Sequence, residues 1–315
     1  MRDEAGGCGA MKLAVLGPGG VGGLLAAALH RSGVDVTAIA REPTAAAIAE
    51  RGVSVQSVTL GEFVAPVPAV TELAEPVDAL IVATKAGGLG DALERVRVDP
   101  PLVLPLLNGL DHLTSLRERF DPASVVAGTI RVEADNPQPG VVVHASRFLL
   151  VEMASRFEHA REGMALLAQT LADAGVRARG DWPISPHSEA TVMWSKLVRL
   201  NALACTTSAY DKLLGEIRDT PALRADLQGA IVEASTVAQL EGAEEVSAEK
   251  AIEELERAHD SLGSSMQRDI AAGRAPELDA IPGSVLRAGE RHGVECPIIE
   301  RLVGMIRARL QGAAS

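Results

Sequence analysis

The pattern that offers chemistry most directly is a glycine-rich stretch near the N-terminus. Gly17, Gly19 and Gly22 stand at GxGxxG spacing in GPGGVG, after the apolar run KLAVLG and before an Ala/Leu-rich segment. A strand that ends in such a turn and opens a helix offers backbone N–H groups and the positive end of the helix dipole to a phosphate. We expect a dinucleotide to be bound by Gly17, Pro18, Gly19, Gly20, Val21 and Gly22. The alternative is a tight glycine turn without a ligand.

The end of the second predicted strand, VDVTAIAR (34–41), bears on which dinucleotide is bound. NAD sites usually place Asp or Glu there to hold the ribose hydroxyls, whereas this sequence has Arg41 followed by Glu42. An arginine at this point can clamp a 2′-phosphate and stack on adenine. The residue types favour NADP(H) with Arg41 as a ligand. The alternative is NAD, with Glu42 on the ribose and Arg41 on the surface.

Three polar residues elsewhere are candidates for ligand contact. Lys85 follows the apolar strand DALIVAT and Asn108 follows LVLPLL, so both stand at carboxyl strand ends, where open α/β sheets bind ligands. The alternatives are a surface loop lysine and a turn-forming Asn-Gly pair. Lys196 lies in the largely apolar helical stretch MWSKLVRLNALA and either extends to solvent or faces a cleft. Periodicity alone favours solvent.

The elements that must position these residues follow from the apolar patterning. Up to about residue 183, short apolar runs alternate with helical segments, which predicts a parallel sheet with helices on both faces. After that point the pattern is helical, over 186–210, 221–242, 247–273 and 283–312. We predict an α/β N-terminal Rossmann-type dinucleotide-binding domain over 11–183, followed by an all-α C-terminal substrate and catalytic domain over 184–315. Residues 1–10 are predicted to be a disordered extension.

Composition excludes several classes of partner. Of the 315 residues 47% are hydrophobic, and the net charge is −12, which argues against binding to nucleic acid or an anionic membrane. Aromatic residues are only 2%, so stacking platforms for single strands are not expected. Cys8, Cys205 and Cys296 have no disulfide or zinc spacing. Without a long apolar run or a leader pattern, we expect a cytoplasmic protein with no metal and no membrane segment.

Taken in order along the chain, these segments resemble the ketopantoate reductase (2-dehydropantoate 2-reductase) family. The resemblance covers about residues 11 to 310 and rests on GPGGVGG, the Arg41 strand end, TKAGG (84–88), LLNG (106–109), WSKL (194–197) and SSMQRDIAAGRAPELD (264–279). The glycine turn alone is generic, whereas WxKL combined with SSM…ELD is specific to that family. The resemblance implies reduction of a ketone by hydride from NADPH.

The resemblance also implies a role for each matching residue. Lys196 would donate the proton to the ketone oxygen and stabilise the developing alkoxide. Asn108 would help position substrate and nicotinamide, and Lys85 would lie near the cofactor phosphate. Ser265 would bind the substrate carboxylate and Glu277 its hydroxyl group. The implied catalytic set is thus Lys196, Glu277 and Asn108, and the implied ligand of the 2′-phosphate is Arg41.

Some segments depart from the family pattern, among them ASRFLL after PGVVVH (139–144), where the family often has a glycine. The family commonly places Asn four residues after the lysine, but that position is Leu200, and Asn201 comes five residues after Lys196. A five-residue step in a regular helix turns a side chain by about 140°. We predict a π-type irregularity that turns Asn201 toward the substrate; the alternative is that Asn201 does not serve the site and Arg199 binds a carboxylate instead. The polar residues that the family has after the lysine matching Lys85 are replaced here by Gly87-Gly88-Leu89-Gly90. This replacement suggests an altered substrate pocket.

The leading hypothesis is NADPH-dependent reduction of 2-dehydropantoate to pantoate, a step of pantothenate and coenzyme A biosynthesis. A second hypothesis is a related NADPH-dependent reductase of another 2-oxo acid or an imine. A third is an NADP(H) sensor without turnover, against which the joint presence of Lys196, Ser265 and Glu277 counts. The expected partner is a small 2-oxo acid, and the apolar faces of the helical domain are compatible with a homodimer.

Overall fold

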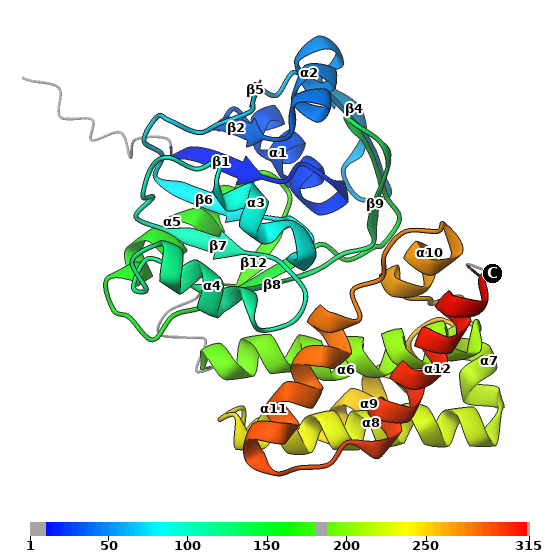
Figure 1. Ribbon diagram of the computed structural model, residues 1–315. Helices are drawn as coiled ribbons and strands as arrows, with labels where there is room; N and C mark the ends of the chain where they lie inside the picture. The colour runs from blue at the N-terminus through cyan, green and yellow to red at the C-terminus, as the bar shows by residue number, and fades with distance from the viewer. Residues whose placement is uncertain (1–10, 180–187, 314–315) are drawn as a thin grey trace, which may run out of the picture. The chain divides into compact units, whose positions relative to one another are not determined.

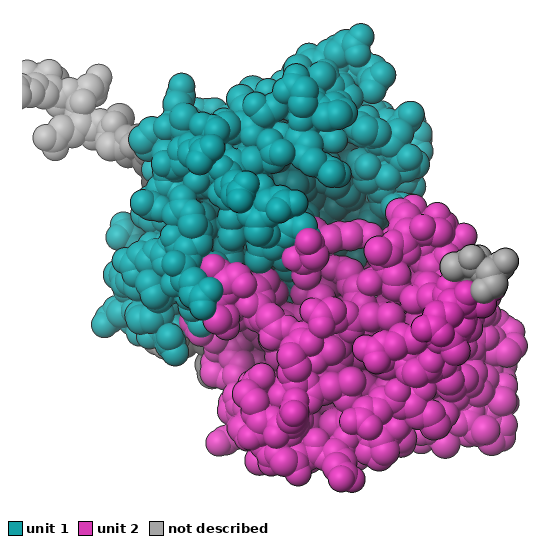
Figure 2. Space-filling view, viewed as in Figure 1, with its two compact units in different colours: residues 1–84, 88–107, 116–186 teal, residues 85–87, 108–115, 187–315 magenta. Residues whose placement is uncertain are grey.

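The computed structural model describes residues 11–179 and 188–313, and these separate into two compact units (Figure 2). Among the described residues, the first unit holds 11–84, 88–107 and 116–179, and the second holds 85–87, 108–115 and 188–313. Two short segments of the N-terminal half therefore belong to the helical unit, which the sequence did not indicate. The predicted divide between residues 183 and 184 and the predicted extension over 1–10 lie outside the described residues.

A five-stranded parallel sheet organises the first unit. Its strands are β1 (Lys12–Leu16), β2 (Asp35–Ile39), β5 (Ala69–Val70), β6 (Ala79–Val82) and β7 (Val103–Pro105). They lie in the order β5-β2-β1-β6-β7, so the chain moves outward to one side of β1 and then resumes on the other side with β6. The reversal makes the carboxyl ends of β1 and β6 a topological switch point, the usual ligand position in such sheets. Continuous Val, Leu, Ile and Ala runs suit strands that are buried on both faces.

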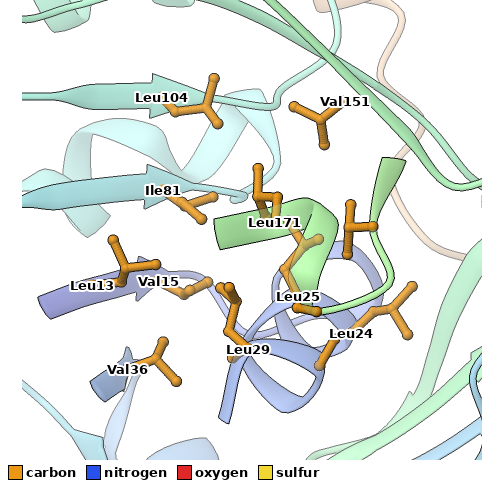
Figure 3. Close-up of a cluster of buried hydrophobic side chains, with 14 of the residues drawn as sticks. Leu13, Val15, Leu24, Leu25, Leu29, Val36, Ile81, Leu104, Val151 and Leu171 are labelled. Atoms are coloured by element: carbon orange, nitrogen blue, oxygen red, sulfur yellow. The ribbon is translucent and has the colours of Figure 1, made fainter. Parts of the chain in front are cut away.

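Helix α1 (Gly20–Arg31) packs between this sheet and a second one. The second sheet has the order β4 (Gly61–Ala65), β3 (Val53–Ser57), β10 (Val141–His144) and β9 (Ala134–Gln138). Contact on both sides explains why α1 is apolar all round and buried from Gly22 to Leu29. In Figure 3 the α1 side chains Leu24, Leu25 and Leu29 gather beside Leu13 and Val15 of β1.

The rest of the first unit is built from a third sheet and short helices (Figure 1). The third sheet has the order β12 (Arg177–Arg179), β11 (Leu150–Ala154) and β8 (Ala127–Arg131). The helices are α2 (Glu42–Arg51), α3 (Leu89–Leu93), α4 (His112–Arg119) and α5 (Ala160–Asp173), and a 3-10 turn spans Ala86–Gly88. The first residues of α4 belong to the second unit.

The second unit is helical and is arranged around α6 (Glu189–Tyr210). Its other elements are α7 (Leu214–Asp219), α8 (Pro221–Leu240), α9 (Ala248–Arg257), α10 (Ser265–Ala271), the π-helical turn η2 (Asp279–Gly283), α11 (Ser284–His292) and α12 (Pro297–Ala313). Helix α6 is preceded by the capping Ser188, whose hydroxyl accepts from Thr191 N, and is followed by Asp211 in the left-handed conformation. Contacts with α8, α9, α10, α12 and η2 bury most of its surface.

The predicted fold class, a Rossmann-type α/β domain followed by a helical domain, is confirmed. Two of the predicted long helices are each divided in two. The segment 247–273 breaks between α9 and α10, and 283–312 breaks between α11 and α12, where Gly293 has a φ of 67° and Pro297 opens the next helix.

Candidate active site

The glycine turn has the backbone geometry that phosphate binding needs. Gly17 has a φ of 86°, which favours glycine, and a Cβ at Gly22 would lie 2.3 Å from the carbonyl oxygen of Gly17. A Cβ at Gly19 would meet no atom within 4 Å, so the loop is open at the start of α1. No side chain caps α1 and no acidic residue stands in its first turn. Its terminal N–H groups therefore suit an anionic ligand, and the turn fits a dinucleotide phosphate.

Arg41 and Glu42 lie beyond the carboxyl end of β2, where α2 begins. Both side chains are exposed, and neither makes a hydrogen bond or ion pair with another described residue. Arg41 is the N-cap of α2, so its backbone is fixed while its guanidinium has room to reach a ligand.

A chain of hydrogen bonds joins three of the predicted residues within the second unit. Lys196 Nζ donates to Asn108 Oδ1 at 2.9 Å, and Asn108 Nδ2 donates to Glu277 Oε2 at 2.9 Å. All three side chains are half-buried. The Asn108 amide presents its oxygen to Lys196 and its nitrogen to Glu277. This orientation suits both neighbours, because an ammonium can only donate and an ionised carboxylate can only accept. Lys196 thus turns inward, contrary to the preference for solvent that periodicity indicated.

The segment that carries Asn108 is held tightly against η2 and α11. Gly109 has a φ of 84°, and a Cβ there would lie 2.1 Å from the carbonyl oxygen of Ala280. Asp111 Oδ2 and Arg287 Nη2 are 2.5 Å apart. These contacts fix the backbone on either side of Gly109, so the position of the Asn108 amide is set by η2 as well as by its own hydrogen bonds.

Lys85 belongs to a second charged cluster of the same unit. Its Nζ lies 2.7 Å from Asp269 Oδ2, and Arg274 Nε lies 2.7 Å from Asp269 Oδ1. The Asp269 side chain is 7% exposed, whereas those of Lys85 and Arg274 are 55% and 47% exposed. One buried carboxylate thus pairs with two cations whose side chains are about half exposed. The excess positive charge suits an anionic ligand.

The predicted π-type irregularity between Lys196 and Asn201 is wrong. Helix α6 is α-helical throughout, and the π-helical turn of the unit is η2 instead. A regular helix turns the Asn201 side chain away from that of Lys196, into the packed interior, where it is fully buried. Its Oδ1 accepts weakly from Cys205 Sγ at 3.5 Å, and its Nδ2 has no partner among the described residues. Asn201 is therefore not joined to the Lys196 chain.

Three other residues, Leu200, Arg199 and Ser265, bear on the predicted substrate contacts. Leu200, half-buried, occupies the place one turn after Lys196. Arg199, offered as an alternative carboxylate ligand, is ion-paired with Glu254 at 2.5 Å. Ser265 is the first residue of α10, the helix that carries Asp269, and its half-buried hydroxyl has no hydrogen-bond partner among the described residues.

His112 is a residue of this region that sequence reasoning missed. It opens α4, is 4% exposed, and neither ring nitrogen has a hydrogen-bond partner among the described residues. Burial, together with the positive charge of Lys196, lowers the pKa of His112 to about 3. Its ring is therefore neutral at physiological pH. The only feature of the sequence that could have pointed to His112 is its position four residues after Asn108, and that spacing is not specific to any function.

The lowered pKa of His112 predicts acid sensitivity. Between pH 6.5, which equals the ordinary pKa of histidine, and about pH 3, His112 is protonated in the unfolded chain but neutral in the folded chain. Unfolding free energy should therefore fall with decreasing pH, by about 1.4 kcal/mol per pH unit from this one group. Chemical unfolding at about pH 6 and about pH 4 should show this slope, and His112→Phe should remove that share of it. Substituting the exposed His159 should leave the slope intact; an equal slope in wild type and His112→Phe would contradict the assignment.

Comparison with known proteins places the chain in a family. Residues 13–152 match the family model described as ketopantoate reductase PanE/ApbA, and residues 190–310 match the model of its C-terminal part. The chain belongs to the ketopantoate reductase PanE/ApbA family. Like the relatives that are named as enzymes, this ketopantoate reductase family member is an oxidoreductase.

Individual relatives are moderately distant. An uncharacterized oxidoreductase, YkpB of Bacillus subtilis (strain 168), is 31% identical over 302 residues, covering 92% of this chain and 96% of the relative. A 2-dehydropantoate 2-reductase of Mycobacterium tuberculosis (strain ATCC 25618 / H37Rv) is 28% identical over 311 residues, covering 95% and 98%. A D-mandelate dehydrogenase structure with NADH and anilino(oxo)acetate shares the fold, with a TM-score of 0.86, 24% identity, and coverage of 97% and 100%.

The described residues lack two further features. No group of three or more His, Cys, Asp and Glu side chains is placed to hold a metal ion in this part of the chain. Within 11–179 and 188–313, none of the helices combines the length and apolarity of a membrane span.

Proposed function

We propose that this family member reduces 2-dehydropantoate to pantoate, with NADPH as the hydride source and Lys196 as the proton donor. The observation that carries the proposal is the hydrogen-bonded chain from Lys196 through Asn108 to Glu277. A lysine held inward by a neutral amide can deliver a proton to a carbonyl oxygen, and its charge stabilises the alkoxide as it develops. Substrate class and cofactor are drawn from the family membership and from the glycine turn.

The proposed reaction makes separate demands on the residues of the site. When bound, the reduced nicotinamide supplies a hydride to the carbonyl carbon of the 2-oxo acid. Lys196 Nζ transfers a proton to the carbonyl oxygen as the C=O double bond becomes a C–OH single bond, and it then regains a proton from water. Asn108 Oδ1 holds Nζ in place, and Glu277 Oε2 holds the Asn108 amide. Glu277 also binds the substrate hydroxyl group, and Ser265 binds the carboxylate.

The first unit supplies the proposed dinucleotide site. The open turn at Gly19 receives the pyrophosphate at the N-terminus of α1, and Arg41 binds the 2′-phosphate of NADP(H). Lys85, which belongs to the second unit and is paired with Asp269, is a further cation that we propose for the cofactor phosphate. These local cations compensate for the net charge of −12.

The test of the function is NADPH oxidation measured with 2-dehydropantoate and with a panel of other 2-oxo acids. The proposal predicts the highest kcat/KM for 2-dehydropantoate. A higher value for another oxo acid or an imine would support the second candidate. This candidate is favoured by Leu200, an apolar side chain one turn from Lys196 where a polar group was expected. Cofactor binding without turnover of any of these compounds would indicate a sensor.

Arg41 provides a separate prediction on cofactor choice. Losing a charge-assisted contact to a phosphate typically costs about 1.5–3 kcal/mol, so Arg41→Ala should weaken NADPH binding about 10- to 100-fold and leave NADH binding nearly unchanged. Dissociation constants from the fluorescence of the reduced cofactors measure both. Arg51→Ala, at the exposed far end of α2, is the matched control. Comparable affinities for NADPH and NADH, both unaffected by Arg41→Ala, would favour the alternative in which Glu42 binds the ribose.

Three further expectations stay predictions: the role in pantothenate and coenzyme A biosynthesis, the cytoplasmic location, and a homodimer formed through the helical unit. Size-exclusion chromatography with light scattering measures the last of these directly.

A further inference from the structure

Thr207 and Ser264 form a buried contact between helices α6 and α10 that the proposed mechanism does not use. Their hydroxyl oxygens are 2.8 Å apart, and the two residues are 0% and 2% exposed. Thr207 donates its single hydroxyl proton to the carbonyl oxygen of Leu203, at 2.7 Å, so the Ser264 hydroxyl donates to Thr207. Ser264 in turn accepts the Gln267 N–H at 3.0 Å and caps α10. A continuous row of hydrogen bonds therefore joins the start of α10 to the backbone of α6.

This contact restricts where the first turn of α10 can lie. Hydrogen bonds between hydroxyl groups are directional and vary in length by only about 0.5 Å, and a buried hydroxyl without a partner is destabilising. A backbone bond from Leu214 N to Leu262 O, at 2.9 Å, also holds the chain before α10, but Gly263 lies between that bond and Ser264. The Thr207 hydroxyl acts on Ser264 itself and thus on the first turn of the helix.

Helix α10 carries groups that the proposed function needs. Ser265 directly follows Ser264, and its half-buried hydroxyl has no hydrogen-bond partner among the described residues. Asp269 lies one turn later on the same helix, where it pairs with Lys85 and Arg274. A shift of the first turn of α10 would therefore displace the Ser265 hydroxyl and the charged cluster together.

Thr207 stands on the side of α6 that bears Lys196. It follows Lys196 by 11 residues in a helix that is α-helical throughout. At about 3.6 residues per turn this step is close to three full turns, so the two side chains leave α6 within about 20° of each other. One helix thus carries both the proposed proton donor and the attachment point of the helix that bears Ser265.

We propose that Thr207 is a positioning residue, which fixes the first turn of α10 against α6 and thereby sets the place of the Ser265 hydroxyl for the substrate carboxylate. The inference rests on the proposed function, in which Ser265 binds that carboxylate. Because Thr207 is fully buried, it acts through Ser264 rather than by touching the substrate. The carboxylate is present before and after hydride transfer, so its contact stabilises ground state and transition state alike and is expressed in KM.

Thr207→Val tests the proposal, because valine keeps the shape of the side chain and replaces its hydroxyl group by a methyl group. KM for 2-dehydropantoate should rise about 10-fold, with kcat and the NADPH dissociation constant nearly unchanged. Thr207→Ser retains a hydroxyl and should restore most of the substrate affinity. Thr206→Val is the matched control: Thr206 is equally buried, but its hydroxyl donates to Ala202 within α6, so KM should stay as in wild type.

Two further measurements separate positioning from folding. In a Ser265→Ala background, Thr207→Val should raise KM by no more than about 2-fold, because its effect passes through the missing hydroxyl. Hydrogen exchange of the full-length protein, read by mass spectrometry, reports the anchoring of α10 without turnover. A peptide spanning 262–270 should exchange about 10-fold faster in Thr207→Val than in wild type, and at the wild-type rate in Thr206→Val.

Each possible result decides a separate part of the proposal. An unchanged exchange rate in Thr207→Val would overturn the anchoring of α10. Faster exchange with an unchanged KM, or an equal rise of KM in the Ser265→Ala background, would overturn the positioning role. If wild type neither binds nor reduces any 2-oxo acid, the proposed function fails together with the carboxylate role of Ser265, while the exchange rates still decide whether Thr207 anchors α10.

Discussion

Lys196→Ala is expected to reduce kcat/KM for 2-dehydropantoate by about 100- to 10,000-fold, the range of a lost general acid. The loss should appear mainly in kcat, because proton donation and alkoxide stabilisation act in the transition state. NADPH affinity should change little, since the lysine is bonded to Asn108 in the helical unit and the glycine turn belongs to the other. Steady-state kinetics and cofactor titration measure both quantities.

Two other substitutions make the Lys196 result interpretable. Lys196→Arg keeps a cation for the alkoxide but holds its proton too firmly to donate it, so its loss should be smaller than that of Lys196→Ala yet still large. Lys212→Ala removes a lysine that is ion-paired with Glu216 on the surface, and it should behave as wild type. Turnover that survives Lys196→Ala unchanged would remove Lys196 from the role of proton donor.

Gly109→Ala is expected to damage both stability and activity. Its φ of 84° is unfavourable for alanine, and the new Cβ would lie 2.1 Å from the carbonyl oxygen of Ala280, which is backbone and cannot simply rotate away. Strain and displacement together should lower the free energy of unfolding by about 2–4 kcal/mol. Moving the segment away from η2 also shifts Asn108, so kcat/KM should fall about 10- to 100-fold even in the folded protein.

Gly273→Ala is the matched control for this substitution. Gly273 has a φ of 66°, but a Cβ there would meet nothing within 4 Å, so it reproduces the conformational cost without the close approach. Its expected destabilisation is about 1 kcal/mol, with activity retained. Denaturant unfolding and steady-state kinetics on both variants separate the two effects. Equal consequences for the two variants would show that the contact with Ala280 does not position the site.

The parts of the site that could be predicted from sequence are those fixed by local rules. Gly17, Gly19 and Gly22 were identified because a strand, a turn and a helix follow each other directly, and each glycine answers a backbone requirement of that turn. Lys85 and Asn108 are predicted as ligand contacts because they follow buried strands, and that role stays a prediction.

Local rules do not predict contacts between residues that lie far apart in the sequence. Asn108 meets Lys196 across 88 positions, and Lys85 meets Asp269 across 184. The ion-pair partners Asp269 and Arg274 and the buried His112 were not predicted, because nothing local distinguishes them from surface residues. The apolar periodicity around Lys196 predicts that its side chain extends to solvent. Periodicity carries no information about the amide of Asn108, which comes from another part of the chain. The prediction that Asn201 turns toward the substrate was wrong because it relied on the family resemblance. The regular geometry of α6 places this side chain in the interior.

The helical unit is assembled from three separate stretches of chain. Recombination between family members can therefore separate the residues of the candidate site. A fragment that begins at residue 188 carries Lys196 and Glu277 but leaves Lys85 and Asn108 behind. Recombination between two family members at a single crossover after the α/β half would therefore join the lysine of one parent to the asparagine of the other. Under the function proposed above, an exchange of substrate preference between family members requires moving residues 85–87 and 108–115 together with the C-terminal part.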